Sequence, residues 1–300
     1  MTKPMARRAF LKTVPAAAAG MVTYAGQTAK PAGVKIGASS YTPVFDYPIR
    51  PKRGAEVRIR DRFWKPRIAT NAEVTIPFEI QKLAQADRNL NNNLLEAAIL
   101  SVQTHQDPVL AARVERQITA MAAQAGRGNS NFEVAAAYYH ASGKRDLLDQ
   151  AIKSAAAIYD NFQQNNPPFS GGERDAINCV QLYRATHDRK HLELAKHYLD
   201  IRGLENSVNR SRHNQSYKPV LEQSKAVGHA VNGVTLMVSL TDVGVLTGLK
   251  DYFNAAQRMW ADAVERKMYI TGGVGSSGNE GFGEPYVLPN ISAYAETCAS

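Results

Sequence analysis

Apolar residues recur at helical spacing along almost the whole chain from about residue 77 onward. Positions three and four apart share one face of a helix, and the breaks between these segments hold Gly, Asn, Asp or Pro, which typically end helices. The pattern predicts helices at roughly 76–86, 92–105, 108–125, 131–142, 145–163, 173–187, 189–202, 222–247 and 249–267. Ahead of them, "EVRIRDRFWKPRI" alternates Val57 and Ile59 and continues into Phe63 and Trp64, which predicts a short strand followed by an aromatic anchor.

A weak internal repeat groups these helices in pairs. "YYHASGKRDLLDQAIKSAAAIYDNF" from Tyr138 aligns with "LYRATHDRKHLELAKHYLDI" from Leu182, 44 residues later, and "LTDVGVLTGLKDYFNAAQRMWADAV" is a looser copy. The first helix of each unit ends at Gly143, His187 or Gly248. Repeated antiparallel helix pairs form either an open solenoid or a closed α/α toroid. The long, basic, Asn-rich loop 203–223 favours the toroid, because such loops gather at one rim and build a pocket.

The basic charge of the chain lies at its start. The first 60 residues hold eleven Lys and Arg against Asp46 and Glu56, which accounts for the whole formal net charge of +9. The remainder has 25 basic and 25 acidic residues. A nucleic-acid-binding face is therefore not expected on the body of the protein.

The N-terminal segment "MARRAFLKTVPAAAAGMVTYAGQTA" has a charged start, a short apolar stretch and small residues near its end. This pattern is typical of a signal peptide, and "RRAFLK" resembles the twin-arginine export signal. The apolar stretch is too short to span a bilayer, so no integral membrane segment is expected. We predict a signal peptide at 1–29, an irregular linker or arm at 30–56, a helical domain at 57–300, and export to the periplasm or the outside of the cell.

The C-terminal segment "MYITGGVGSSGNEGFGEPYVLPNISAYAETCAS" departs from helical periodicity and holds the candidate chemistry. No strand precedes its glycines and no Lys lies among them, which argues against a phosphate-binding loop. Glu296 and Cys298 point to one side of an extended or loop backbone and there form a plausible half of a zinc site. The alternative is an exposed Glu and a buried Cys at the start of a helix. Cys179 lies on an apolar helix face and is expected to be a small buried hydrophobe, so no disulfide framework is indicated.

Several stretches resemble glycoside hydrolase family 127, the β-L-arabinofuranosidases. They are "GSSGNEGFGEPYVLPNISAYAETCAS", "KPVLEQSKAVGHAVNGVTLM" and "DRFWKPRIATNAEVTIP", and the resemblance covers residues 57–300. It implies an all-α catalytic domain, an (α/α)6 toroid, with a short N-terminal strand or arm in this chain. An oligosaccharide or polysaccharide substrate is implied as well.

The resemblance also implies site residues. Glu280 aligns with the general acid/base, with Glu284 on the same loop as the runner-up, and His229 aligns with a sugar-contacting histidine. Glu296 and Cys298 align with two ligands of a zinc that one Glu and three Cys hold. The family's nucleophile is a zinc-bound cysteine from an adjacent Cys-Cys pair. A zinc-held thiolate is a competent nucleophile, and the acid/base would protonate the leaving oxygen and then deprotonate water, which gives retention.

This sequence departs from the family pattern at several positions. It has no adjacent cysteine pair, and Ser130, Gly172 and Tyr217 stand where the family has histidines. The twelve helices of a toroid also need more chain than this one has. We therefore expect the 300 residues to be an incomplete catalytic domain that binds zinc poorly and turns over little substrate.

The predicted function is that of an exported glycoside hydrolase that removes terminal furanosides from glycans by a zinc-cysteine retaining mechanism. Two alternatives remain open. One is a non-catalytic glycan-binding toroid, which would retain glycan without turnover or bound metal. The other is a lyase or an unsaturated-uronide hydrolase on the same scaffold. Neither an oligomeric state nor the particular sugar is predicted.

Overall fold

The structure is a computed structural model that describes residues 47, 52, 54–86, 88, 90–123, 131–169, 172, 174–294 and 296–299. Every described residue lies in one compact unit, Gly33–Ser300. The predicted signal peptide 1–29 lies outside the described residues, as does most of the predicted linker 30–56.

The described residues are organised by α-helices, and no strand is assigned within them. The helices are α1 Trp64–Thr70, α2 Ile76–Gln85, α3 Asn92–Thr104, α4 Pro108–Ala123, α5 Phe132–Ser142, α6 Asp146–Asn165, α7 Asp175–Thr186, α8 Arg189–Ile201, α9 Ala230–Thr247 and α10 Lys250–Arg266. Short helical turns are η2 Gly54–Glu56, the π-helical η3 Asn71–Thr75 between α1 and α2, η4 Val220–Glu222 and η5 Thr297–Ala299. The all-α class predicted from the periodicity is confirmed, and most helix boundaries agree within one to three residues.

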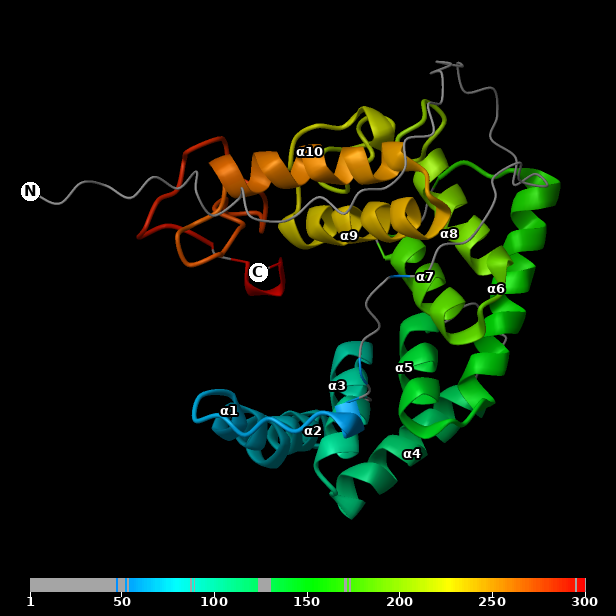
Figure 1. The fold of residues 1–300 in the computed structure, drawn as a ribbon, viewed down its shortest axis with the longest axis vertical. Coiled ribbons are helices and arrows are strands. Elements are labelled where there is room, and N and C mark those ends of the chain that lie inside the picture. The colour runs from blue at the N-terminus through cyan, green and yellow to red at the C-terminus, as the bar shows by residue number, and fades with distance from the viewer. Residues whose placement is uncertain are drawn as a thin grey trace, which may run out of the picture. The chain divides into compact units, whose positions relative to one another are not determined.

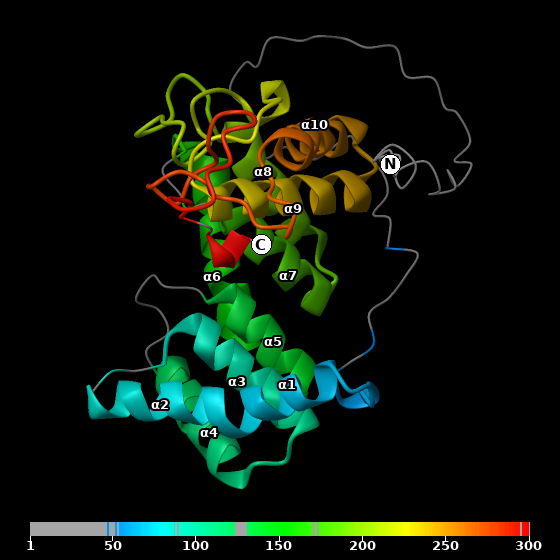
Figure 2. The ribbon, with the colours of Figure 1, turned by 90° about the vertical axis from the view of Figure 1, so that its left-hand side faces the viewer.

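The helices pack as antiparallel pairs in two rows (Figures 1 and 2). The pairs are α3 with α4, α5 with α6, α7 with α8, and α9 with α10. The first members of the pairs contact one another in the order α3, α5, α7, α9, and the second members α4, α6 and α8 follow the same order behind them. This two-row arrangement is that of an α/α toroid.

Local sequence explains where the first helix of each pair stops. Gly143, His187 and Gly248 cap α5, α7 and α9 in the left-handed conformation, with φ of 75°, 57° and 72°. A left-handed residue just after a helix redirects the chain and lets its N–H bond back to the last turn. The helix ends predicted at these three positions are confirmed.

Helix α9 occupies the interior of the fold. Twelve of its residues are buried, among them Leu236, Leu240 and Val243. Within the part of the chain that the structure describes, α9 is the helix long and apolar enough to cross a membrane, but 67% of that stretch is buried inside the protein. A core helix of a soluble protein passes the same test, so α9 is weak evidence for a membrane span.

The predicted strand near Val57 is wrong. Residues 57–60 are irregular, and the side chains of Phe63 and Trp64 are 55% and 58% exposed rather than anchored in a core. A strand needs a partner to satisfy its backbone, and none of the described residues pairs with this segment. Asp61 instead accepts the backbone N–H groups of Phe63 and Trp64 at 2.7 and 2.5 Å, which starts α1.

The predicted helix 222–247 is wrong in its first third. The segment after η4 is irregular, and α9 begins only at Ala230. Buried side chains in α10 and just after it hold this segment in place: Asp262 of α10 accepts the N–H of Ala226 at 3.0 Å, and Lys267, the C-cap of α10, donates to the Ala226 carbonyl at 2.6 Å. Gly228 then takes a φ of 71°, which a right-handed helix excludes.

Candidate functional site

The candidate site forms where the amino end of α9 meets the glycine-rich C-terminal segment. Ala230 donates its N–H to the carbonyl of Glu280 at 2.8 Å, and Phe282 donates to the carbonyl of Gly228 at 2.9 Å. These bonds make His229 and Gly281 an antiparallel bridge. The pairing joins segments about fifty residues apart in sequence and places the side chains of His229 and Glu280 side by side.

Glu280 is held at both of its carboxylate oxygens. His229 Nε2 lies 2.6 Å from Oε2, and the Tyr294 hydroxyl donates to Oε1 at 2.7 Å. The hydrogen bond from Tyr294, followed by the bond to His229, holds the pKa of Glu280 below its ordinary value. The Glu280 side chain remains 42% exposed, so a substrate can reach a carboxylate that is already oriented.

His229 is itself oriented from two sides. It is the N-cap of α9, and its Nδ1 lies 3.4 Å from the N–H of Asn232. Its backbone N–H donates to the carbonyl of His213 at 3.0 Å, and the two imidazole rings pack edge to face with centroids 5.3 Å apart. Since Nδ1 faces the helix N–H, Nε2 is the nitrogen presented to Glu280.

The buried side-chain amides of two glutamines support the backbone around His229. Gln215, 1% exposed, donates Nε2 to the carbonyls of Val227 at 2.8 Å and His229 at 3.1 Å. Gln223, with no exposed surface, donates Nε2 to the carbonyls of Gln215 at 2.8 Å and Lys218 at 2.9 Å. Loop 203–223 is therefore fixed to the segment that ends at His229.

Glu284, the runner-up for the acid/base role, lies elsewhere on the loop. Its side chain is exposed, and its carbonyl accepts the N–H of Val287 at 3.1 Å. No interaction of the Glu284 carboxylate with His229 or Tyr294 is found among the described residues. The geometry therefore favours Glu280 over Glu284.

Glu296 and Cys298 lie together on the last described turn. Glu296 is 7% exposed, and its Oε1 accepts the backbone N–H of Cys298 at 2.9 Å. The side-chain hydrogen bond to the Glu296 carboxylate raises the pKa of the Cys298 thiol. Gly275, at a φ of 85°, lets this turn approach closely, because a Cβ there would lie 2.7 Å from the Glu296 Cβ. Cys298 is exposed rather than buried, in contrast to the non-metal alternative.

Glu296 and Cys298 are residue types that bind zinc, but two ligands are too few for a zinc site. Carboxylate oxygen and thiolate sulfur are both zinc ligands, and a tetrahedral protein site usually takes three or four of them. Among the described residues, no three or more His, Cys, Asp or Glu side chains gather closely enough to hold a metal. Cys179 cannot contribute, because it is 1% exposed within α7, as the sequence predicts, and burial raises the pKa of its thiol.

Sequence reasoning missed Tyr294 and His213. Tyr294 lies fourteen residues from Glu280, in the quoted motif two positions before Glu296.

Of the positions where family histidines are replaced, Ser130 lies outside the described residues. Gly172 presents only its carbonyl, which accepts from Arg202 at 2.7 Å.

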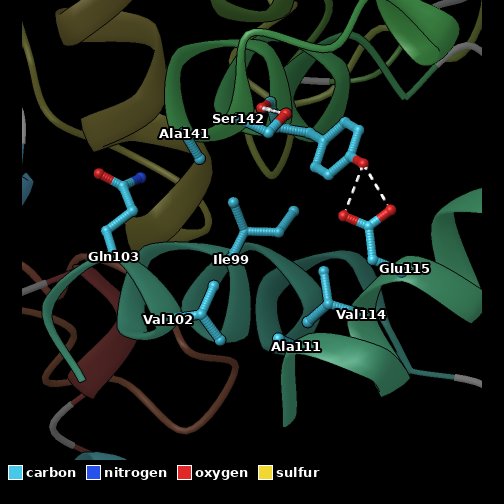
Figure 3. A pocket seen from close by; sticks show the side chains of 9 residues that line it. Ile99, Val102, Gln103, Ala111, Val114, Glu115, Ala141 and Ser142 are labelled. Atoms are coloured by element: carbon cyan, nitrogen blue, oxygen red, sulfur yellow. Dashed lines mark hydrogen bonds between the residues drawn. The ribbon is translucent and has the colours of Figure 1, made fainter. Parts of the chain in front are cut away.

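A separate pocket of about 140 Å³ lies between α3, α4 and α5 (Figure 3). Its wall is mostly apolar, and the Tyr138 hydroxyl donates to both oxygens of Glu115 at 2.9 and 2.8 Å. Lys144 also pairs with Glu115 at 2.8 Å and lowers the pKa of that carboxyl. Gln103 and Ser142 place the pocket at the carboxyl ends of α3 and α5, whereas His229 stands at the amino end of α9. The lining of this pocket holds no histidine and no carboxylate other than Glu115, so the pocket is not the candidate reaction site.

Comparison with known proteins gives a consistent result. A family model described as the β-L-arabinofuranosidase GH127 catalytic domain matches residues 129–300. A non-reducing end β-L-arabinofuranosidase of Bifidobacterium longum subsp. longum is 31% identical over 191 residues, which cover 56% of this chain and 29% of that protein.

Two solved structures share the fold. The GH127 β-arabinofuranosidase BT3674 matches with a TM-score of 0.76 and 31% identity, over 84% of this chain and 50% of the other. Ara127N-Se, a GH127 β-L-arabinofuranosidase from Geobacillus stearothermophilus T6, matches with a TM-score of 0.71 and 26% identity, over 81% and 50%. The chain spans half the length of these solved relatives and less than a third of the curated one.

Proposed function

The chain belongs to the GH127 family of glycoside hydrolases, and from this premise we propose that it removes terminal β-L-arabinofuranose, or a related furanose, from glycans. The observation that carries the proposal is the Glu280–His229 pair at 2.6 Å on the rim formed by the amino end of α9. The curated relative is named as acting at non-reducing ends, which supports a terminal sugar as the one released.

Glu280 would exchange the proton of the reaction. As a carboxylate that accepts from Tyr294 and lies 2.6 Å from His229, it is prepared to deprotonate a water molecule. A Glu280 that has taken up a proton from water is the acid form, which can protonate a leaving oxygen. His229, fixed as the N-cap of α9 with its ring proton on Nε2, orients the Glu280 carboxyl and serves as a sugar contact.

We propose in addition that the protein uses zinc, with Glu296 and Cys298 as two of its ligands. When bound, zinc would keep a cysteine thiolate deprotonated and oriented for attack on the sugar. Export by the twin-arginine pathway is proposed from Arg7 and Arg8 and the apolar stretch that follows them.

The direct test is hydrolysis of a panel of nitrophenyl glycosides by the complete protein. We expect nitrophenol release from the β-L-arabinofuranoside and little from the α-L-arabinofuranoside or the pyranosides, with zinc found by elemental analysis of the active preparation. Retention on glycan-containing gels without turnover of any member of the panel would support a binding protein instead. Absorbance change with uronic-acid substrates would support a lyase.

The pH dependence of the reaction tests the role of Tyr294. Its hydroxyl lowers the pKa of Glu280, so Tyr294→Phe should raise that pKa toward the ordinary value of a glutamate. The limb of the kcat/KM profile that reports Glu280 then moves to higher pH. Tyr286→Phe is the control, because Tyr286 lies on the same segment, is 72% exposed and should leave the profile unchanged. A limb that moves to lower pH, or moves equally in both variants, would contradict the assignment.

A further inference from the structure

The loop between α8 and α9 brings three cations to Tyr217, two of them near its ring and one at its backbone carbonyl. Arg210 donates Nη2 to the carbonyl of Tyr217 at 2.8 Å. The Arg212 guanidinium carbon lies 5.5 Å from the centroid of the Tyr217 ring, and the Lys218 ammonium lies 5.8 Å from it. Cations over aromatic faces are attracted by the ring quadrupole, which holds Arg212 and Lys218 at the Tyr217 ring. The hydrogen bond to the Tyr217 carbonyl holds Arg210 beside them.

These charges have no acidic counterpart. Residues 206–221 contain no Asp or Glu, and none of the three cations pairs with a carboxylate in the described part of the chain. Lys267, by contrast, is neutralised by Asp262 at 3.0 Å. Arg210 and Arg212 are exposed and Lys218 is half-buried. A cluster of unpaired cations on a fixed loop attracts negatively charged groups.

The cationic loop lies directly against the candidate reaction site. His213, next to Arg212 in sequence, packs its ring on that of His229. The backbones also touch, since a Cβ on Gly228 would lie 1.8 Å from the Arg212 carbonyl. In Figure 2 this loop and the C-terminal segment lie at the same end of α9. A group bound by these cations would therefore be a near neighbour of a sugar at Glu280.

We propose that Arg210, Arg212 and Lys218 form an anion subsite that holds a carboxylate or sulfate substituent of the glycan beside the sugar at Glu280. Guanidinium groups match the planar or tetrahedral oxygens of these anions with paired hydrogen bonds. The inference rests on the proposed function and narrows its substrate class to acidic glycans.

Binding of matched oligosaccharides tests the subsite. The probes are an oligogalacturonate, its carboxyl-reduced neutral counterpart and a sulfated galactan oligosaccharide, with dissociation constants measured by calorimetry at low salt. We expect one or both acidic probes to bind more tightly than the neutral probe, and the tighter acidic probe identifies the natural anion. Arg212→Gln with Lys218→Gln should weaken acidic binding by roughly fivefold per cation removed. Ionic strength of about 1 M, where screening acts over ~3 Å, should remove most of the preference.

Two further variants separate the subsite from general charge effects. Lys153→Gln removes an exposed cation on α6 and should leave the preference intact. Arg212→Lys keeps the charge and should retain most of it. Equal binding of acidic and neutral probes, or an equal loss in Lys153→Gln, would overturn the subsite. Hydrolysis of furanosides without any acidic preference would remove the subsite alone, whereas acidic preference without furanoside hydrolysis would remove the proposed function alone.

Discussion

Glu280→Gln is expected to lower kcat for furanoside hydrolysis by about 10²–10⁴-fold, the usual contribution of a positioned acid or base. Glutamine keeps the shape of glutamate and can stay beside His229, whose Nε2 lies 2.6 Å from Oε2, but it cannot take up or release a proton. The amide nitrogen can also face Tyr294 or His229 as a donor, which disrupts one of the two bonds that orient the side chain. The loss should therefore exceed that from removing either partner.

The choice of leaving group sharpens this test. A nitrophenolate departs without much protonation, whereas an alkyl or sugar alcohol needs a proton from the acid. The kcat of Glu280→Gln should therefore fall further on a disaccharide than on a nitrophenyl glycoside. Glu284→Gln is the matched control on the same loop, and its exposed side chain predicts activity close to that of the unmodified protein. A Glu280→Gln protein with unchanged kcat, or a larger loss in Glu284→Gln, would transfer the acid/base role away from Glu280.

Local signals made most of the fold predictable. The helix ends at Gly143, His187 and Gly248 follow from residue types that accept the left-handed conformation, which is a property of a few neighbouring residues. The helices of each pair were predictable for the same reason, because the apolar residues that form one helix face all lie within one segment of the sequence. The strand near Val57 failed because strand formation depends on a partner, and alternation within one segment does not supply it.

Individual residues of the candidate site were predictable from the sequence, but their contacts with one another were not. Glu280, His229, Glu296 and Cys298 were indicated by resemblance to a family motif, but their contacts depend on chain pairing over long separations. The bond from Tyr294 to Glu280 spans fourteen residues of irregular backbone, for which no periodicity exists. The start of α9 at Ala230 depends on Asp262 in α10 and on Lys267 just after α10. A side chain that fixes a distant segment leaves no pattern in the sequence of that segment.

Gly228→Ala is expected to destabilise the protein and to separate the segment that ends at His229 from the C-terminal segment that holds Glu280. Gly228 has a φ of 71°, and an added Cβ would lie 1.8 Å from the Arg212 carbonyl oxygen and 2.7 Å from the His213 Cα. These are backbone atoms, so no side-chain rotation can relieve the overlap. The left-handed conformation alone costs an alanine about 1–2 kcal/mol, and overpacking adds about 1–3 kcal/mol.

Gly143→Ala isolates the first of these contributions, the cost of the left-handed conformation. Gly143 has nearly the same φ, 75°, but a Cβ there meets nothing within 4 Å. We therefore expect Gly143→Ala to lower the free energy of unfolding by only the conformational cost, and Gly228→Ala to lower it by clearly more, as measured by denaturant or thermal unfolding. Because Gly228 accepts the Phe282 N–H and precedes His229, its displacement should also reduce furanoside turnover, while Gly143→Ala, far along the chain at the end of α5, should not. Equal destabilisation by the two variants would mean that the close approach of the Arg212 loop to Gly228 does not hold the site together.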